Sequence, residues 1–184
     1  FRKVQVYIGR PGASIAEASY IPPTANEVIP LFSNLEKYLK SDEEKDKLVQ
    51  IAVAHYQFEA IHPFLDGNGR VGRLIISLFL YEKKLLSHPF LYLSEFFEEH
   101  RQYYYELLRG VSEKQDWISW VKFFLEALAT QAKKAESTGK EILKLHTGYK
   151  EKIIEINSMY AANLLDAIFI RPIFTTASLR KYVR

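Results

Sequence analysis

A polar loop broken by glycine divides the most apolar part of this sequence, and it limits the folds open to the chain more than any other feature. The loop HPFLDGNGR, from His62 to Arg70, lies between the apolar runs AVAHYQFEAI and LIISLFLY. Glycine adopts positive backbone torsion angles without strain, and Asn68 between Gly67 and Gly69 also tolerates the left-handed region. The flanking runs have helical length and periodicity. The sequence therefore predicts two core helices joined by a tight turn whose polar groups are available for chemistry.

Helical periodicity also dominates the rest of the chain. Helix starts are indicated by Ser41 with Glu44 at capping-box spacing, by Ser94 and by Asp116. The predicted helices are Glu27 to Lys40, LVQIAVAHYQFEAI, RLIISLFLYEKK, EFFEEHRQYYYELLRG closed by Gly110, and a long segment from WISWVKFFLEALATQAKKA through Ile154 with a break at Gly139.

The only strand-like stretches lie near the start of the chain. VQVYIG and SYIPP are separated by a Pro-Gly pair, which predicts one small β-hairpin. Pro22 and Pro23 exclude a long or central strand there, because proline has no N–H to donate to a ladder. The fold class expected is therefore all-α with a small hairpin.

The composition changes after Lys152. The segment NSMYAANLLDAIFIRPIFTTASLRKY predicts a helix, a short connection and a second helix capped by Thr175 or Thr176. We therefore expect three parts: a main domain over residues 1–136, a connecting helix over 137–156, and a separate C-terminal segment over 157–184.

The composition excludes several classes of protein. With 48% hydrophobic and 14% aromatic residues in 184, the chain can bury a sizeable core. It has no cysteine, which excludes disulfides and thiolate metal sites and suits a reducing, cytoplasmic location. The 25 basic and 22 acidic residues nearly balance, so charge alone does not indicate nucleic acid. No apolar run has transmembrane length, and we expect no membrane partner.

The residues of the loop predict an anion-binding site. A glycine-rich entry into a helix turns several backbone N–H groups toward one point, at the positive end of the helix dipole. Arg70 and Arg73 follow one helical turn apart. Two guanidinium groups beside such a nest suit a polyphosphate better than a lone carboxylate.

Two further side chains complete the predicted chemistry. Asp66 precedes the nest and would repel phosphate unless a cation bridged them, which indicates Mg²⁺ held by one carboxylate and phosphate oxygens. His62 has an ordinary pKa near neutrality and suits a general base. With no cysteine in the chain and no serine in the loop, the simplest reaction is proton removal from an incoming hydroxyl that attacks a metal-held phosphate.

At these residues the sequence resembles the Fic family, whose pattern is H-P-F-x-D/E-G-N-G-R-x-x-R. Residues 62–73, HPFLDGNGRVGR, match every fixed position. The resemblance extends from Phe1 to the long helix near Lys134 and includes VYIG, YIPP, HYQFEAIHPF, YYELL and WISWVKFFL. It implies a Fic fold, which is a helical bundle with a small β-hairpin flap.

The resemblance implies a protein adenylyltransferase that moves AMP from ATP to a Tyr, Ser or Thr hydroxyl of a target protein, or of itself, and releases pyrophosphate. Relatives that phosphorylate carry Ala in place of Gly67, so AMP transfer is favoured here. The roles implied are His62 as the base, Asp66 as the Mg²⁺ ligand, Gly67, Asn68, Gly69, Arg70 and Arg73 on the phosphates, and Phe64 as the anchor of the loop. Family members often dimerise, so a homodimer is also consistent with it.

Aromatic and histidine residues outside the loop allow two interpretations each. Tyr104 and Tyr105 fit the family's YYxxL pair near the adenosine, although such a run also suits core packing. His55, two turns before His62, is a buried structural histidine or, with His62 and Asp66, a metal ligand. Trp117 and Trp120, together with Phe123 and Phe124, are expected in the core.

The YIPP segment corresponds to the flap of Fic enzymes, whose edge pairs with the target segment. The resemblance therefore assigns target binding to Ser19, Tyr20, Ile21 and Pro22, and the alternative is a plain surface hairpin.

The family's inhibitory helix, with the pattern S/T-x-x-x-E-G/N, is absent from the sequence. We expect it upstream, because the start FRKVQVYIG resembles the middle of longer bacterial Fic proteins. A partner chain that supplies the helix, or an unrestrained enzyme, is the alternative. The C-terminal segment resembles the opening of a winged-helix module, with TTASLRK as its second helix, or is an extra packing pair.

Three functions stay open at this point. Besides AMP transfer, the motif also fits other Fic chemistry, namely UMP or phosphocholine transfer or AMP removal. A nucleotide-sensing regulator that binds DNA through its C-terminal module is the third, because the sequence pI is about 8.9.

Overall fold

The computed structural model describes the chain except for residues 11, 13, 45, 157 and 181–184, together with the side chains of residues 155 and 156. The chain divides into two compact units, Phe1–Ala132 and Lys133–Arg184. No helix in the described part is both long and apolar enough to cross a membrane.

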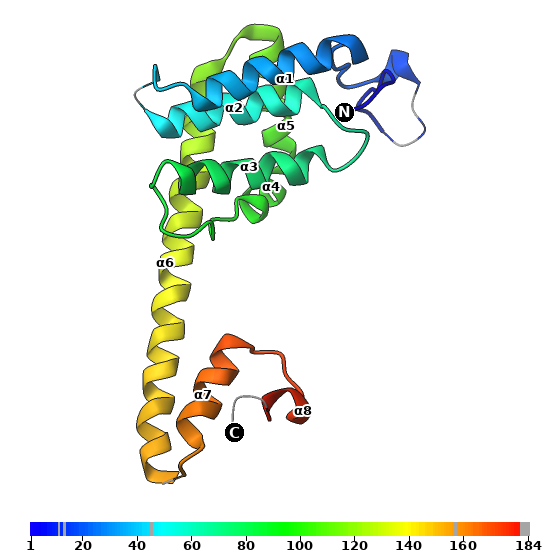
Figure 1. Cartoon of the computed structure of the whole chain (residues 1–184). Helices are drawn as coiled ribbons and strands as arrows, with labels where there is room; N and C mark the ends of the chain where they lie inside the picture. The colour runs from blue at the N-terminus through cyan, green and yellow to red at the C-terminus, as the bar shows by residue number, and fades with distance from the viewer. Residues whose placement is uncertain (11, 13, 45, 157, 181–184) are drawn as a thin grey trace. The chain divides into compact units, whose positions relative to one another are not determined.

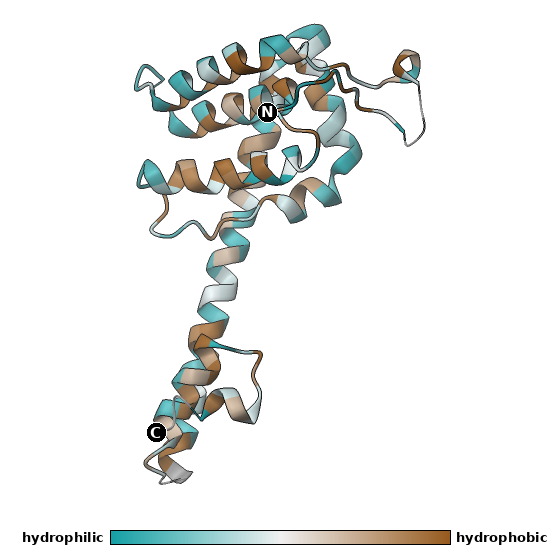
Figure 2. Cartoon of the chain, turned by 45° about the vertical axis from the view of Figure 1, so that its right-hand side comes forward, coloured by the Kyte–Doolittle hydropathy of each residue, from teal (hydrophilic) through white to brown (hydrophobic). Residues whose placement is uncertain are grey.

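The first unit is built from α1 (Ala25–Lys40), α2 (Lys47–Ile61), α3 (Asn68–Glu82), α4 (Ser94–Glu99), α5 (Arg101–Lys114) and the first part of α6 (Trp117–Ile156) (Figure 1). The central helix is α2, which packs against both α1 and α3. Figure 2 shows apolar residues recurring along these stacked helices.

The apolar character of α2 on nearly every side explains its central position. Its buried residues include Ile51, Ala52 and Phe58, and Trp120 of α6 packs beneath it. The Trp120 indole Nε1 donates to the Ala52 carbonyl at 2.9 Å, so the ring is buried without leaving a polar group unpaired. The predicted core positions Trp120, Phe123 and Phe124 are all buried, and Trp117 packs partly buried against this core.

Two of the predicted helix caps are wrong. Ser41 ends α1, and Asp46 begins α2 by accepting hydrogen bonds from the amides of Leu48 and Val49. Asp46 lies directly before the helix and its carboxylate reaches these amides, so the capping-box spacing of Ser41 is not used. Ser94 is the first residue of α4, and Leu93 occupies the cap.

Of the remaining predicted helix boundaries, some are wrong and one is confirmed. His100 separates α4 from α5, so the predicted single helix is two, and Gly110 lies inside α5. The predicted break at Gly139 is wrong, because α6 passes through it to Ile156. Asp116 does cap α6, since its carboxylate accepts from the Ser119 amide at 3.1 Å.

The predicted two-stranded hairpin is not found in the described residues. Ile8 and Tyr20 form one isolated antiparallel bridge, with amide-to-carbonyl distances of 2.8 and 3.1 Å. A 3₁₀ turn over Ile15–Glu17 occupies the segment between them. Pro22 and Pro23, two and three residues after Tyr20, have no N–H with which to extend the ladder.

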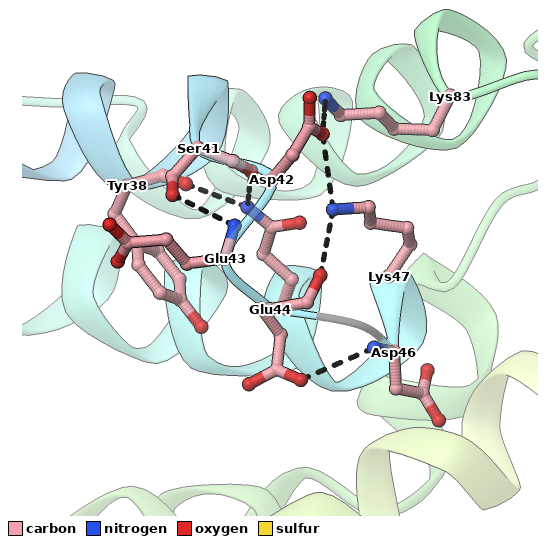
Figure 3. A network of polar contacts seen from close by, with 9 residues as sticks. Tyr38, Ser41, Asp42, Glu43, Glu44, Asp46, Lys47 and Lys83 are labelled. Carbon is pink, nitrogen blue, oxygen red and sulfur yellow. Dashed lines mark hydrogen bonds and ion pairs between the residues drawn. The ribbon is translucent and has the colours of Figure 1, made fainter.

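A polar network fixes the connection between α1 and α2 and joins it to the end of α3 (Figure 3). Asp42 accepts from Lys47 at 3.3 Å and from Lys83 at 3.4 Å. The Gln50 amide donates to the carbonyls of Tyr38 (2.6 Å) and Ser41 (2.9 Å), which end α1. The Lys83 contact joins this connection to the far end of α3, whose beginning carries the polar loop.

The second unit contains the end of α6, α7 (Ala161–Ile170) and α8 (Thr176–Leu179). His146 Nε2 lies 3.2 Å from the Asp166 carboxylate and the His146 ring contacts Phe169, so α7 packs on α6. Thr175 caps α8 by accepting from the Ser178 amide, as one of the two predicted alternatives states. Two short helices occur in many folds, so the winged-helix interpretation and the three-part division stay predictions.

Candidate active site

The polar loop begins where α2 ends, at His62. This residue has left-handed torsion angles (φ 49°, ψ 61°), which are uncommon for any residue other than glycine. Its amide donates to the Phe58 carbonyl at 3.0 Å and its carbonyl accepts from the Arg2 guanidinium Nε at 2.9 Å. The His62 backbone is therefore held from both sides while the chain reverses direction.

The His62 imidazole is half-buried, and its Nδ1 atom is buried with no hydrogen-bond partner in the described residues. Burial lowers the pKa of the His62 imidazole, and the positive charge of Arg2 lowers it further. The nearby backbone carbonyl of Glu59 raises it, although the contact lacks the geometry of an ordinary hydrogen bond. The neutral imidazole is consequently favoured at neutral pH. Since Nδ1 is enclosed, Nε2 is the nitrogen left to take a proton from outside.

The side chain of Asn68 closes the loop. Its Oδ1 accepts from the Phe64 amide at 2.9 Å and its Nδ2 donates to the Phe64 carbonyl at 2.8 Å. The Phe64 ring packs on Phe1 and Phe58, which anchors the loop from below. Asn68 is only 2% exposed, so its amide is fully committed to the loop.

Gly67 provides the turn into α3. Its φ of 82° places it in the left-handed region, and its carbonyl accepts the first helical bond, from the Val71 amide at 3.0 Å. The amides of Asn68, Gly69 and Arg70 therefore precede the first intrahelical bond, and no side chain among the described residues caps them. These three N–H groups would form the predicted anion nest, which stays a prediction.

The two arginines occupy different surroundings. Arg73 donates from Nε to the Ser94 hydroxyl at 2.9 Å and lines a cavity shared with His62. The Arg70 side chain is 74% exposed and lies 3.1 Å from the Asp66 carboxylate. Asp66 also accepts from the Gly67 amide at 2.6 Å. Arg70 and Asp66 are thus paired with each other at the outer edge of the loop.

A cavity of about 530 Å³ adjoins His62. It is lined by residues of the N-terminal segment, α2, α3 and α5, among them Tyr20, Glu59, His62, Gly69, Arg73 and Tyr105. Basic and hydroxyl-bearing groups therefore face the space next to the imidazole. Its volume is in the range of pockets for small ligands.

Tyr104 and Tyr105 both line this cavity but differ in burial. Tyr104 is 6% exposed, and its hydroxyl lies 3.1 Å from His55 Nε2. Burial lowers the pKa of His55 to about 3, so this histidine is neutral and structural, as the first of its two interpretations states. Tyr105 is 50% exposed, and the Arg101 guanidinium lies over its ring, 5.9 Å from the centroid. Tyr105 is therefore the freer of the two to contact a ligand.

The flap residues are placed unequally. Ser19 and Tyr20 line the cavity, and the Tyr20 hydroxyl donates to the Ala60 carbonyl at 2.9 Å. Ile21 is 51% exposed but lies outside the lining residues, and Pro22 is buried. The segment thus offers Ser19 and Tyr20 to the site and turns Pro22 toward the protein.

Glu59 lines the site although the sequence pattern did not indicate it. Burial raises the pKa of Glu59 to about 7, against the opposing charge of Arg73. Its Oε1 atom is buried without a hydrogen-bond partner in the described residues. The spacing of Glu59 and His62 on α2 is the one signal in the sequence that could have drawn attention to it.

The residues present fit a magnesium ion only if phosphate and water supply most of its ligands. No group of three or more His, Asp or Glu side chains in the described part could hold a metal by itself. Asp66 is an exposed carboxylate, which suits an ion that takes its other ligands from phosphate and water. Such an ion would compete with Arg70 for the Asp66 oxygen.

Comparisons with known proteins find relatives of this chain. A profile described as the Fic/DOC family matches residues 1–80. A protein adenylyltransferase Fic of Culex quinquefasciatus is 30% identical over 128 residues, which are 68% of this chain and 22% of that protein. A probable protein adenylyltransferase of Aquifex aeolicus (strain VF5) is 33% identical over 96 residues, covering 52% of this chain and 28% of its own length.

The fold has a solved counterpart. The crystal structure of a Fic family protein from Desulfovibrio desulfuricans G20 superposes with a TM-score of 0.65 at 33% identity, over 76% of this chain and 41% of that one. The chain spans less than a third of the two curated relatives and less than half of the solved protein. The matched residues contain the whole loop from His62 to Arg73, and they place the chain in the Fic/DOC family.

Proposed function

We propose that the chain catalyses transfer of AMP from ATP to a Tyr, Ser or Thr hydroxyl of a protein. The observation that carries the proposal is the cavity in which the His62 imidazole, Gly69 at the start of α3 and the Arg73 guanidinium meet. A base beside an anion nest is what hydroxyl attack on a phosphate requires. The names of the two relatives above support the same activity.

The reaction divides between the two sides of the cavity. The target hydroxyl gives its proton to His62 Nε2 as its oxygen bonds to the α-phosphorus, and the bond from that phosphorus to the bridging oxygen of the β-phosphate breaks. Pyrophosphate leaves with the electron pair, so atoms and charge balance. The free amides of Asn68, Gly69 and Arg70 would bind the α- and β-phosphates, with Arg73 and Arg70 on the outer ones.

Asp66 would hold Mg²⁺ together with phosphate oxygens, and the ion would supply neutralisation of the phosphate charge. Tyr104 and Tyr105 would bound the adenosine, with Tyr105 as the ring that stacks. Ser19 and Tyr20 would lie next to the incoming hydroxyl, and Ile21 and Pro22 would shape the flap behind them.

The test is incubation of the chain with Mg²⁺ and ATP labelled either at the α- or at the γ-phosphate, in a cell lysate. AMP transfer predicts label on protein from α-labelled ATP alone, and its loss in His62→Ala. His88→Ala is the matched control, because His88 is an exposed histidine outside the cavity. Label from γ-labelled ATP, or undiminished label with His62→Ala, would contradict the proposal. Mass spectrometry of the product separates AMP from UMP or phosphocholine by the mass added.

A further inference from the structure

Arg2 is a buried arginine in a segment that is otherwise largely exposed. Its relative exposure is 3%, whereas Phe1 and Val4 are 53% and 57% exposed. Burial of a cation is costly unless hydrogen bonds compensate for the lost water. No acidic side chain among the described residues pairs with Arg2. Its compensation must therefore come from backbone carbonyls.

Those carbonyls belong mainly to the end of α2. The Arg2 guanidinium donates from Nε to the His62 carbonyl at 2.9 Å and from Nη2 to the Ile61 carbonyl at 3.4 Å. The backbone amide of Arg2 donates to the next carbonyl, that of Pro63, at 2.9 Å. The last carbonyls of a helix lack intrahelical donors and form the negative end of its dipole. Arg2 thus supplies the donors and the charge that this helix end lacks.

Two more bonds fix the guanidinium itself. Nη1 donates to the Val4 carbonyl at 3.2 Å, and Nη2 also donates to the Pro23 carbonyl. The planar fork is consequently held between the N-terminal segment, the residues before α1 and the end of α2. A lysine, with one ammonium group, cannot reproduce a fork of this geometry.

We propose that Arg2 is a positioning residue for His62, which it holds in the left-handed conformation that aims the imidazole at the cavity. A non-glycine residue in this conformation costs on the order of 1 kcal/mol or more, so neighbouring contacts must enforce it. Among the described residues, two contacts hold the His62 backbone: the Phe58 carbonyl continues the helix, and Arg2 acts on the reversal itself.

The inference predicts two separable effects on His62. Loss of the fork should let the His62 backbone leave its left-handed state, and loss of the charge should raise the pKa of the imidazole. The other charged or titratable groups that face the cavity around His62 are Arg10, Tyr20, Tyr56, Glu59, Arg73, Arg101, Tyr104, Tyr105, Glu106 and Arg109. Tyr20 is coupled to the Arg2 charge, but burial raises the pKa of Tyr20 and keeps it uncharged where His62 titrates, so a difference in titration is attributable to Arg2.

The experiment compares Arg2→Lys and Arg2→Met with Gln5→Ala in the whole chain. Gln5 is the matched control because its amide ties the same segment to the Pro22 carbonyl at 2.9 Å without contacting His62. Histidine-labelled NMR, with His62 assigned through His62→Ala, measures the imidazole titration and the backbone ¹³C shifts. We expect the backbone shifts to move in both Arg2 variants, the titration to move to higher pH in Arg2→Met only, and neither to change in Gln5→Ala.

The catalytic part of the inference rests on the proposed function. There we expect kcat for AMP transfer to fall about tenfold in Arg2→Lys, with KM for ATP within about twofold of the unsubstituted chain. If the chain transfers no AMP, the proposed function fails and the NMR comparison still decides the role of Arg2. If Arg2→Met does not fold, the backbone shifts of Arg2→Lys decide it. Unchanged His62 shifts in an Arg2 variant that has only lost thermal stability would show that Arg2 merely anchors the segment.

Discussion

A Cβ atom added at Gly72 would lie 2.5 Å from Oε1 of Glu59. The same atom would lie 3.1 Å from Phe58 Cδ1 and 3.2 Å from His55 Cε1. Helices α2 and α3 therefore approach each other at a point where α3 has no side chain, and the Glu59 carboxyl occupies the space. This close approach places Arg73, the next residue of α3, beside the cavity.

Gly72→Ala should accordingly destabilise the protein by about 1–3 kcal/mol, because the methyl group must displace the carboxyl or separate the helices. Gly110→Ala is the matched control, since an added Cβ meets nothing within 4 Å there. In the interior of α5 that change should stabilise by up to about 1 kcal/mol. Denaturant unfolding of both variants measures the difference, and equal effects of the two substitutions would contradict the close approach.

Glu59 should make stability depend on pH. Its pKa is raised by burial to about 7 in the folded chain, so the folded state holds a proton that the unfolded state has released. Stability should therefore fall as pH rises from the ordinary carboxyl range to about 7, by at most about 3 kcal/mol. Glu59→Gln should remove this decline, as unfolding at about pH 5 and about pH 8 would measure.

Glu27→Gln serves as a control of opposite sign. The Thr24 hydroxyl and amide lower the pKa of Glu27, so its contribution is present at neutral pH and is lost as pH falls. If Glu59→Gln and the unsubstituted chain show parallel stability curves across the neutral range, the carboxyl is not buried in its protonated form.

The closure of the loop by Asn68 should be visible in stability as well as in nucleotide binding. Asn68→Ala removes both hydrogen bonds to Phe64 and should cost about 2 kcal/mol of unfolding free energy. ATP affinity should fall too, because the amides of α3 are then no longer held against the reversal of the chain. Asn26→Ala, at an exposed position of α1, should change neither quantity. Calorimetric titration with ATP, beside the unfolding curves, would show whether the two losses occur together.

Arg73 and Arg70 should contribute unequally to ATP binding. Arg73 lines the cavity and is oriented by Ser94, so Arg73→Ala should weaken binding on the order of tenfold to a hundredfold. Arg70 is exposed and already paired with Asp66, so Arg70→Ala should cost less. Dissociation constants measured by titration test the order, and a larger loss for Arg70→Ala would reverse the assignment.

The rate of AMP transfer should already be independent of pH at neutrality. Because burial lowers the pKa of His62, the protonated, inactive form should accumulate only below the ordinary histidine range. A profile of kcat/KM against pH measures the midpoint of the acidic limb. A midpoint at or above about 6.5 would mean that the group that titrates is not an enclosed imidazole.

The loop was predictable because its residues are contiguous, so glycine, Asn68 and the two arginines could be read together. The same holds for Asp116 and Thr175, whose capping bonds are local. Arg2 lies 60 residues from the carbonyl it binds, and nothing in FRKVQV indicates that its charge is buried. The contact between Glu59 and Gly72 likewise could not be predicted, because it forms only when α2 packs against α3.

The errors have physical causes of the same kind. Ser41 satisfies the spacing of a capping box, but Asp46 lies adjacent to α2 and takes the amides first. The hairpin residues have strand-like composition, but those that the structure describes form one bridge, because a 3₁₀ turn and two prolines leave few amides to pair. In both cases the hydrogen bonds available in the folded chain, and not the local sequence preference, determined the structure.

The ring closed between Asn68 and Phe64 has a thermodynamic consequence. Because one side-chain amide already satisfies both the backbone N–H and the carbonyl of Phe64, the loop would have its proposed binding shape before any ligand arrives. Association then loses little conformational entropy in the receptor, and the interaction energy is kept for discrimination among anions. A preorganised turn of this kind would select its ligand by shape complementarity.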